Sequence, residues 1–180
     1  MAIILEGFDG SGKGTFAKRL ALPVFHPGAA PKSKEAEEAF FEEQYRKCNT
    51  PIVHDRVTCI SQQVYQNRLF DEWYLSPAWR MLSTCHCILV YCRPPDDVLL
   101  DFSKHTVEAH DVPEQMEYVR QNAVRLIKAY DELMSRLPHV VYDYTRGDQP
   151  DLVVRLLKSQ FDEREWKLWF RTMKKTLRHS

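Results

Sequence analysis

A glycine-rich segment directly after an apolar run constrains the fold of this chain more than any other feature. Ala2 to Glu6 is a short apolar stretch typical of a buried strand, and it is followed by Gly7-Phe8-Asp9-Gly10-Ser11-Gly12-Lys13-Gly14-Thr15. Glycines let the backbone turn so that successive N–H groups point inward, and the start of a following helix adds a dipole that favours an anion. The segment therefore predicts a phosphate-binding loop between a buried strand and a helix.

The residue types in this loop also predict its ligands. Lys13 has the position from which an ammonium group reaches the β- and γ-phosphates of a nucleotide. The strict motif has Ser or Thr directly after the lysine, whereas here Gly14 comes first, so Thr15 is the expected hydroxyl ligand of Mg²⁺. The Asn-Lys-x-Asp sequence with which GTPases recognise guanine is absent, which favours ATP. The predicted nucleotide contacts are Gly7, Gly10, Ser11, Gly12, Lys13, Gly14 and Thr15.

Short apolar stretches alternate with longer amphipathic ones along most of the chain. Beyond the first, four stretches are typical of strands: Val24 to His26, Pro51 to His54, Cys87 to Cys92 and His139 to Tyr142. A helix is expected over about Ser33 to Lys47 with Ser33 as its N-cap, and another from Pro113 with an apolar stripe through Met116, Val119, Ala123, Ile127 and Tyr130. This alternation predicts the α/β class, a three-layer fold whose five-stranded parallel sheet has helices on both faces.

The chain length predicts one domain over residues 1–160, followed by a terminal helix over residues 161–180. The terminal segment interleaves aromatic with basic residues, namely Trp166, Lys167, Trp169, Phe170, Arg171, Lys174, Lys175 and Arg178. One interpretation is an amphipathic helix that packs its aromatic face on the domain or extends from it. The other is a surface that contacts DNA through stacking and phosphate contacts.

Composition bounds the environment of the protein but not its partner. Lys plus Arg and Asp plus Glu number 25 each, so the net charge neither supports nor excludes an anionic ligand. Apolar runs are too short for a membrane helix, and five cysteines favour a reducing compartment, so we expect a cytoplasmic protein without a membrane partner. Cys85-His86-Cys87 with Cys92 matches no usual zinc spacing, and buried strand thiols are the better interpretation.

Four short motifs occur in order: Glu6-Gly7-x-Asp9-x-x-Gly12-Lys13, Pro27-Gly28 with Pro31, Asp55-Arg56 with Ser61, Tyr65 and Gln66 behind it, and Arg93-Pro94-Pro95. Together they resemble the landmarks of the thymidylate kinase family, over most of Met1 to about Arg146. The resemblance implies a P-loop kinase fold, phosphoryl transfer from ATP, and an acceptor site at the carboxyl edge of the sheet. It also implies a lid at about residues 101–112. Members of the family are often homodimers, and the sequence leaves the oligomeric state open.

The resemblance also implies a role for individual residues. Asp9 would meet the sugar of the acceptor, Asp55 would hold Mg²⁺ through water, and Arg56 would neutralise a phosphate. The predicted catalytic residues are thus Lys13, Asp9, Asp55 and Arg56, and the metal ligands are Thr15 and Asp55. The predicted acceptor contacts are Asp9, Arg56, Ser61, Tyr65, Gln66 and Lys104, and Arg146 is the predicted adenine contact. A surface ion pair for Asp55-Arg56, core packing for Tyr65 and a plain turn at Arg146 are the alternatives.

Departures from the family pattern bear on the acceptor. Phe25 stands where the family has an arginine that clamps the acceptor phosphate, and Gly10 is not the arginine that some members carry in the loop. The lid offers only Lys104, His105 and His110 as cations. An alcohol acceptor needs a carboxylate base, for which Asp9 or Asp55 is placed, rather than clustered arginines.

The segment His26 to Lys32, and Asp55-Arg56 followed by Ile60-Ser61 and Val64-Tyr65, resemble bacteriophage relatives of the family. Among these relatives are kinases that phosphorylate 5-hydroxymethyluracil within DNA on the route to hypermodified thymidines. We therefore favour a thymidine-like acceptor within DNA. The alternative is a deoxynucleoside monophosphate kinase of the dTMP type. A non-catalytic nucleotide-binding module is a weaker hypothesis, because it has no need of Asp55 and Arg56 together.

Overall fold

The computed structural model describes residues 2–20, 22–27, 33–104 and 113–146. Five strands, β1 (Ala2–Glu6), β2 (Val24–Phe25), β3 (Val53–Asp55), β4 (Cys87–Cys92) and β5 (Val140–Tyr142), form one sheet in the order β2-β3-β1-β4-β5. Every pairing in the sheet is parallel, and β1 lies at its centre between β3 and β4. The predicted five-stranded parallel sheet is therefore confirmed.

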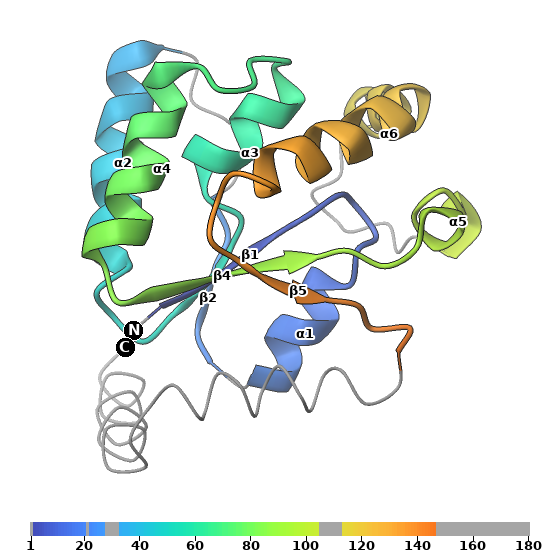
Figure 1. Ribbon diagram of the computed structural model, residues 1–180, viewed down its shortest axis with the longest axis horizontal. Helices are drawn as coiled ribbons and strands as arrows, with labels where there is room; N and C mark the ends of the chain where they lie inside the picture. The colour runs from blue at the N-terminus through green and yellow to red at the C-terminus, as the bar shows by residue number, and fades with distance from the viewer. Residues whose placement is uncertain (1, 21, 28–32, 105–112, 147–180) are drawn as a thin grey trace.

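Helices cover both faces of this sheet (Figure 1). They are α1 (Lys13–Leu20), α2 (Lys34–Lys47), α3 (Thr58–Tyr65), α4 (Glu72–Thr84), the short α5 (Asp96–Leu99) and α6 (Pro113–Met134), with a 3₁₀ turn at Phe102–Lys104. In Figure 1, α1 lies on one side of the sheet, and α2, α3, α4 and α6 lie on the other. The three-layer α/β fold is thus confirmed. Most of the predicted lid, residues 105–112, and the whole predicted helix over residues 161–180 lie outside the described residues.

The central strand shows why the sheet is covered on both sides. All five residues of β1 are buried, because alternate side chains enter two different apolar clusters. Ala2 and Ile4 pack with α2, α3, α4 and α6, whereas Ile3 and Leu5 pack with Phe16 of α1. A strand that is apolar on both faces is stable only inside a covered sheet.

The longest helix, α6, follows the predicted apolar stripe. Val119, Ala123, Ile127 and Tyr130 are all buried against the first cluster. The end of β4 is tied to this helix by Arg93, whose Nε and Nη2 atoms donate to Asp131 at 2.7 and 2.9 Å. This two-pronged pair fixes α6 against the carboxyl edge of the sheet.

The carboxyl ends of the five strands meet at this one edge, and the loops that follow them carry the predicted site residues. Three strands differ from expectation. The strand β2 ends at Phe25 rather than His26, β3 runs over Val53–Asp55 rather than Pro51 to His54, and β5 begins at Val140 rather than His139. Proline has no N–H to donate to a ladder, which accounts for the later start of β3.

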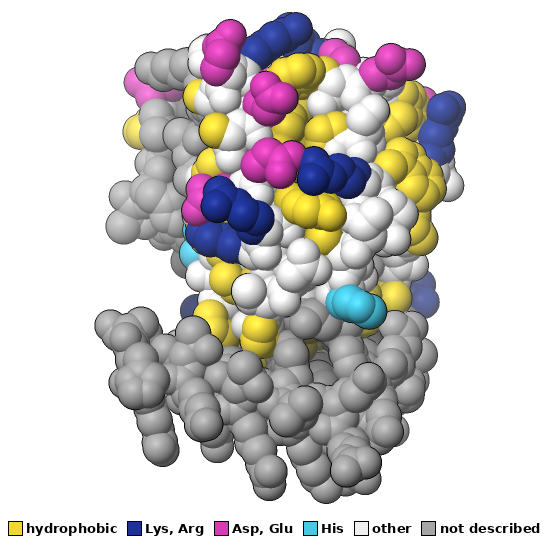
Figure 2. All heavy atoms as spheres, turned by 90° about the vertical axis from the view of Figure 1, so that its left-hand side faces the viewer, with side chains coloured by type: hydrophobic (Ala, Val, Ile, Leu, Met, Phe, Trp, Pro, Cys, Tyr) yellow, Lys and Arg dark blue, Asp and Glu magenta, His cyan; other side chains and the backbone are white. Residues whose placement is uncertain are grey.

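The five cysteines are free, and all are buried except the half-buried Cys87. Within the described ranges, no group of three or more His, Cys, Asp or Glu side chains is placed to hold a metal ion. The same part of the chain contains no helix with the length and apolar character to cross a bilayer. Figure 2 shows the α2 and α4 side, where acidic and basic side chains surround apolar ones, and Arg80 of α4 pairs there with Glu42 of α2.

The N-cap of α2 gives a first test of the fold. The Ser33 side chain accepts a hydrogen bond of 3.2 Å from the N–H of Ala36, as the sequence predicts. Ser33→Ala should lower the free energy of unfolding by about 1 kcal/mol, measured by urea denaturation, because that N–H loses its partner. Ser33→Asp should retain the stability, since aspartate caps equally well; equal stability of all three proteins would contradict the assigned cap.

Candidate functional site

The glycine-rich loop between β1 and α1 has the tight backbone that the sequence predicts. Gly7 and Gly12 have φ angles of +143° and +86°, which side chains with a Cβ atom rarely adopt. A Cβ on Gly7 would lie 2.4 Å from the carbonyl oxygen of Cys92, and one on Gly12 would lie 2.6 Å from the ring of Tyr144. A Cβ on Gly14 would meet nothing within 4 Å. The loop is therefore wedged between β4 and the segment after β5, and it is open at Gly14.

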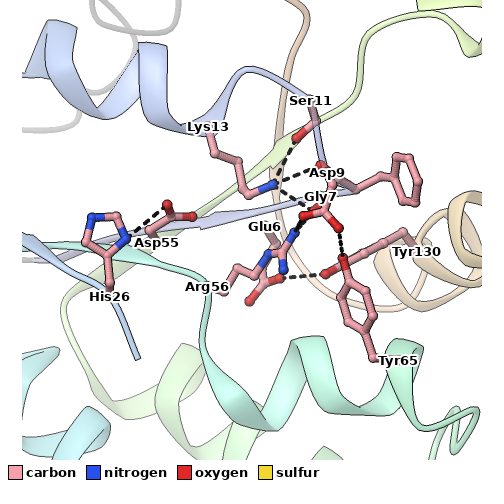
Figure 3. A network of polar contacts seen from close by, with 11 residues as sticks. Glu6, Gly7, Asp9, Ser11, Lys13, His26, Asp55, Arg56, Tyr65 and Tyr130 are labelled. Carbon is pink, nitrogen blue, oxygen red and sulfur yellow. Dashed lines mark hydrogen bonds and ion pairs between the residues drawn. The ribbon is translucent and has the colours of Figure 1, made fainter. Parts of the chain in front are cut away.

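Lys13, the first residue of α1, points back into this loop (Figure 3). Its Nζ atom donates to the carbonyl oxygens of Gly7 and Phe8 at 3.0 and 2.9 Å, and to Ser11 Oγ at 3.3 Å. Burial lowers the pKa of Lys13, and the nearby charge of Arg56 lowers it further, while the carboxylates of Asp55 and Asp9 oppose the shift. A buried ammonium group held by neutral oxygens is well placed to exchange those partners for phosphate oxygens.

Arg56 follows β3 and joins the loop to α3. It has a φ of 74°, unusual for a residue other than glycine, and its guanidinium forms an ion pair with Asp9. The guanidinium carbon lies 5.1 Å from the centre of the Tyr65 ring, and the Tyr65 hydroxyl donates to the other oxygen of Asp9 at 3.1 Å. Burial opposes ionisation of Asp9, but the charges of Arg56 and Lys13 outweigh it and lower its pKa. Asp9 is therefore a carboxylate held on both oxygens.

A second carboxylate, Glu6, lies fully buried at the end of β1. One oxygen accepts from the backbone N–H of Val57 at 2.7 Å and the other from the Tyr130 hydroxyl of α6 at 3.3 Å. Burial raises the pKa of Glu6 to about 7, although the Val57 hydrogen bond and Arg56 act in the opposite direction. Glu6 thus connects β1 to the start of α3 and to α6 directly below the Asp9 and Arg56 pair (Figure 3).

Asp55, the last residue of β3, lies on the opposite side of Lys13 from Asp9 in Figure 3. Its Oδ2 atom is 3.3 Å from Nδ1 of His26, which follows β2. The Asp55 side chain is 19% exposed and that of His26 59% exposed. Asp55 therefore presents a carboxylate towards the loop from a rigid strand end, and Thr15 presents an exposed side chain from the first turn of α1.

The structure brings some of the predicted site residues together and leaves others apart. Gly7, Asp9, Lys13, Arg56 and Tyr65 are connected by direct contacts, with Asp55 beside them.

Three predicted contacts lie outside this network. Ser61 is buried and donates to the carbonyl of Val57 in its own helix. Gln66, at the end of α3, bonds with Gln62 and Tyr74. Arg146 pairs with Asp143 after β5 and is 71% exposed. The side chain of Lys104 lies outside the described part of the chain. The roles proposed for these residues remain predictions.

Sequence reasoning assigned no role in the site to four residues that shape it, namely Glu6, His26, Tyr130 and Tyr144. Glu6 is a charged residue in an otherwise apolar strand, and this signal could have identified it as a buried partner. His26 comes directly after a predicted strand, at the edge where ligands bind in parallel sheets. Tyr130 and Tyr144 give no such signal, because only the packing of α6 and of the segment after β5 brings them to the site.

Comparison with known proteins supports the architecture. No protein-family model matches this chain, and no curated protein matches it. Among solved structures, the YorR protein from Bacillus subtilis, in complex with phosphorylated GDP, has a TM-score of 0.65 at 19% identity. The similarity covers 89% of this chain and 97% of YorR.

Two kinases give lower scores. Deoxyadenosine kinase from M. mycoides, with the products dCMP and dCDP bound, has a TM-score of 0.53 at 18% identity over 89% of this chain and all of that chain. A thymidylate kinase from Ehrlichia chaffeensis has a TM-score of 0.48 at 16% identity over 89% of this chain and 98% of that chain. At these identities the comparisons establish the fold, which is that of the nucleotide kinases.

The glycines of the loop give a matched pair for a stability test. Gly12→Ala should destabilise the protein by roughly 1–2 kcal/mol, because alanine would need a positive φ and would contact the Tyr144 ring. Gly14→Ala should stabilise it by about 0.5–1 kcal/mol, since the added methyl group enters open space within a helix. Urea denaturation measures both values, and the same sign for both would contradict the assigned loop conformation.

The raised pKa of Glu6 predicts a dependence of stability on pH. Between about pH 4.5 and 7 the unfolded chain ionises this carboxyl group while the folded protein keeps its proton, so Glu6 makes the protein less stable as pH rises. The free energy of unfolding of Glu6→Gln, relative to wild type, should therefore increase over this range by up to about 3 kcal/mol. Denaturation of both proteins at pH 5 and pH 7.5 measures it, and a constant difference would contradict the raised pKa.

Proposed function

We propose that this chain is an ATP-dependent kinase that transfers the γ-phosphoryl group to a thymidine-like nucleotide. The observation that carries the proposal is the arrangement of Lys13, Arg56 and Asp55 around one loop at the carboxyl edge of the sheet. Phosphoryl transfer needs fixed positive charge around the phosphates and a carboxylate for the metal or the nucleophile. A protein that only binds a nucleotide has no need of the buried Arg56 and Asp9 pair beside that loop.

The residues present fit ATP and Mg²⁺. The buried Lys13 is held by neutral oxygens, and the glycines at Gly7 and Gly12 keep side chains out of the loop. Backbone N–H groups from Gly7 to Thr15 and the ammonium of Lys13 would hold the nucleotide phosphates. The Thr15 hydroxyl would hold the metal directly, and the Asp55 carboxylate would hold it through water. When bound, these groups supply the transferable phosphoryl group and neutralise its developing charge.

The solved structures that resemble this chain support a nucleotide as the ligand. YorR is in complex with phosphorylated GDP, and the deoxyadenosine kinase has nucleotide products bound. Adenine as the base rests on the sequence argument alone, with Arg146 as the proposed contact. Tyr144, two residues before Arg146, packs against Gly12 and is a second candidate for contact with the base.

Charge around the acceptor side favours an alcohol over a phosphate. Arg56 already pairs with Asp9. Phe25 is apolar, and Lys47, whose Nζ atom lies 3.5 Å from the centre of the Phe25 ring, pairs with Glu43. An anionic acceptor therefore finds less free positive charge than a monophosphate requires. Asp9 is held on both oxygens and has a lowered pKa, so Asp55 is the better carboxylate to accept a proton from an attacking hydroxyl.

We therefore favour 5-hydroxymethyluracil within DNA as the acceptor, as in phage thymidine hypermodification, over a free dTMP-type monophosphate. We also propose a cytoplasmic setting, that of the host if the chain is phage-encoded, because all five cysteines are free thiols. DNA contact by residues 161–180 and a homodimer remain further proposals.

The test is transfer of labelled γ-phosphate from ATP, in parallel, to duplex DNA that contains 5-hydroxymethyluracil and to free dTMP. We expect label on the DNA, and a loss of about hundredfold or more in Lys13→Ala because a charge at the transferring group is removed. Asp55→Ala should lose activity as well.

Label only on dTMP would replace the favoured acceptor with the alternative. If wild type binds ATP in the assay buffer but labels neither acceptor, the non-catalytic nucleotide-binding module becomes the better hypothesis. A Lys13→Ala protein as active as wild type would contradict the proposed site.

A further inference from the structure

A groove of about 660 Å³ runs along the outer side of α6, away from the phosphate-binding loop. Residues of α6 form one wall, and Asn67 and Leu69, which follow α3, together with Leu100 after α5, form the other. The apolar parts of this lining are partly open to solvent, since Leu100 is 38% and Val124 53% exposed. The groove therefore offers an apolar floor that the kinase site described above does not use.

The charged residues in this groove are unbalanced. Arg120, Arg125 and Lys128 line it against one carboxylate, Glu132, which gives three positive charges minus one negative charge, or +2. The whole chain has 25 basic and 25 acidic residues, so this surplus is a local feature. A positive groove on a neutral protein favours an anionic ligand.

These cations are also left without acidic partners. Within the described ranges, Arg120, Arg125 and Lys128 form no ion pair, whereas Arg80 and Lys47 on the α2 and α4 side each pair with a glutamate. Arg125 is fixed by neutral groups, since it donates to Asn67 Oδ1 at 3.1 Å and to the Tyr118 hydroxyl at 2.7 Å. Its orientation is thus set while its charge stays available, which is the preorganisation that an anion site needs.

A chain of hydrogen bonds links the groove to the proposed acceptor site. The Tyr118 hydroxyl that accepts from Arg125 donates to the backbone carbonyl of Tyr65 at 3.1 Å, and Tyr65 is the residue that holds Asp9. Asn67 lies two residues beyond Tyr65, at the end of α3. A ligand that reaches from the acceptor site into this groove must be larger than one nucleotide and must carry repeated negative charge.

We propose that this groove binds the phosphate backbone of the DNA strand that carries the acceptor base, with sugars or bases on the apolar floor at Leu100 and Val124. The inference rests on the proposed function, because it assumes that the acceptor lies within a polynucleotide. Spaced cations beside an apolar surface are the combination with which proteins hold single strands without reading their sequence. Contacts in the groove keep the strand in place while one base occupies the acceptor site.

The experiment measures binding of a fluorescent single-stranded oligodeoxynucleotide by anisotropy over a range of salt concentrations. The test variant is Arg120→Gln with Lys128→Gln, which leaves the Arg125 contacts intact. The matched control is Lys18→Gln with Arg19→Gln, which removes the same charge from two exposed positions of α1, on the opposite side of the sheet (Figure 1). A third variant, Glu132→Gln, raises the charge of the groove by one.

We expect the groove variant to bind DNA about tenfold more weakly, with the slope of log affinity against log salt smaller by about 1.4 for two lost phosphate contacts. The control should bind like wild type, and Glu132→Gln should bind more tightly. Transfer to free dTMP, if wild type performs it, should be unchanged in the groove variant.

Equal DNA binding by the groove variant and the control would overturn the groove, even if wild type phosphorylates DNA. Polyglutamate is measured as a competitor in the same assay. If it binds more tightly than DNA, the proposed DNA-binding role is wrong and the groove is assigned to an acidic protein. Loss of DNA binding in the groove variant alone would support the groove whether or not transfer to DNA is detected, so that the two proposals fail separately.

Discussion

The pairing of Arg56 with Asp9 connects the two strand ends on which the site is built. Asp9 belongs to the loop after β1, Arg56 follows β3, and their contact places Tyr65 of α3 over the same carboxylate. The Arg56 side chain is only 20% exposed, so the loss of Asp9 would leave a mostly buried guanidinium without its charged partner. The positive φ of Arg56 indicates that the backbone after β3 is held in an unusual conformation to make this contact.

Local features of the sequence predicted most of the fold. The strand, loop and helix around Gly7 to Lys13, the Ser33 cap and the stripe of α6 each depend on residues close together in the chain. The contacts of the site could not be predicted in this way, because they join residues far apart in the chain. Tyr65 lies 56 residues from Asp9, and Tyr130 lies 124 residues from Glu6, and no periodicity or motif links such pairs. The ends of β2, β3 and β5 were also misplaced by one or two residues, because local residue patterns do not fix where a ladder of hydrogen bonds ends.

Two carboxylates at the same edge differ in character because their surroundings differ. Asp9 is ionised and held by Arg56 and Tyr65, whereas Glu6 is fully buried with neutral hydrogen-bond donors, and burial raises its pKa to about 7. Asp55 differs from both in its partner, since it lies beside His26 rather than beside Arg56 or Tyr130. All three residues are acidic in the sequence, and only their partners in the fold distinguish an ion-paired carboxylate, a buried structural group and a carboxylate beside a histidine.

One helix, α6, carries both the hydroxyl that bonds to Glu6 and the cations of the outer groove. Tyr130 faces the interior, and Lys128, two residues earlier, lines the groove. Both faces belong to one continuous helix of 22 residues. DNA bound in the outer groove would therefore rest on the same helix that supports Glu6 beneath the phosphate loop.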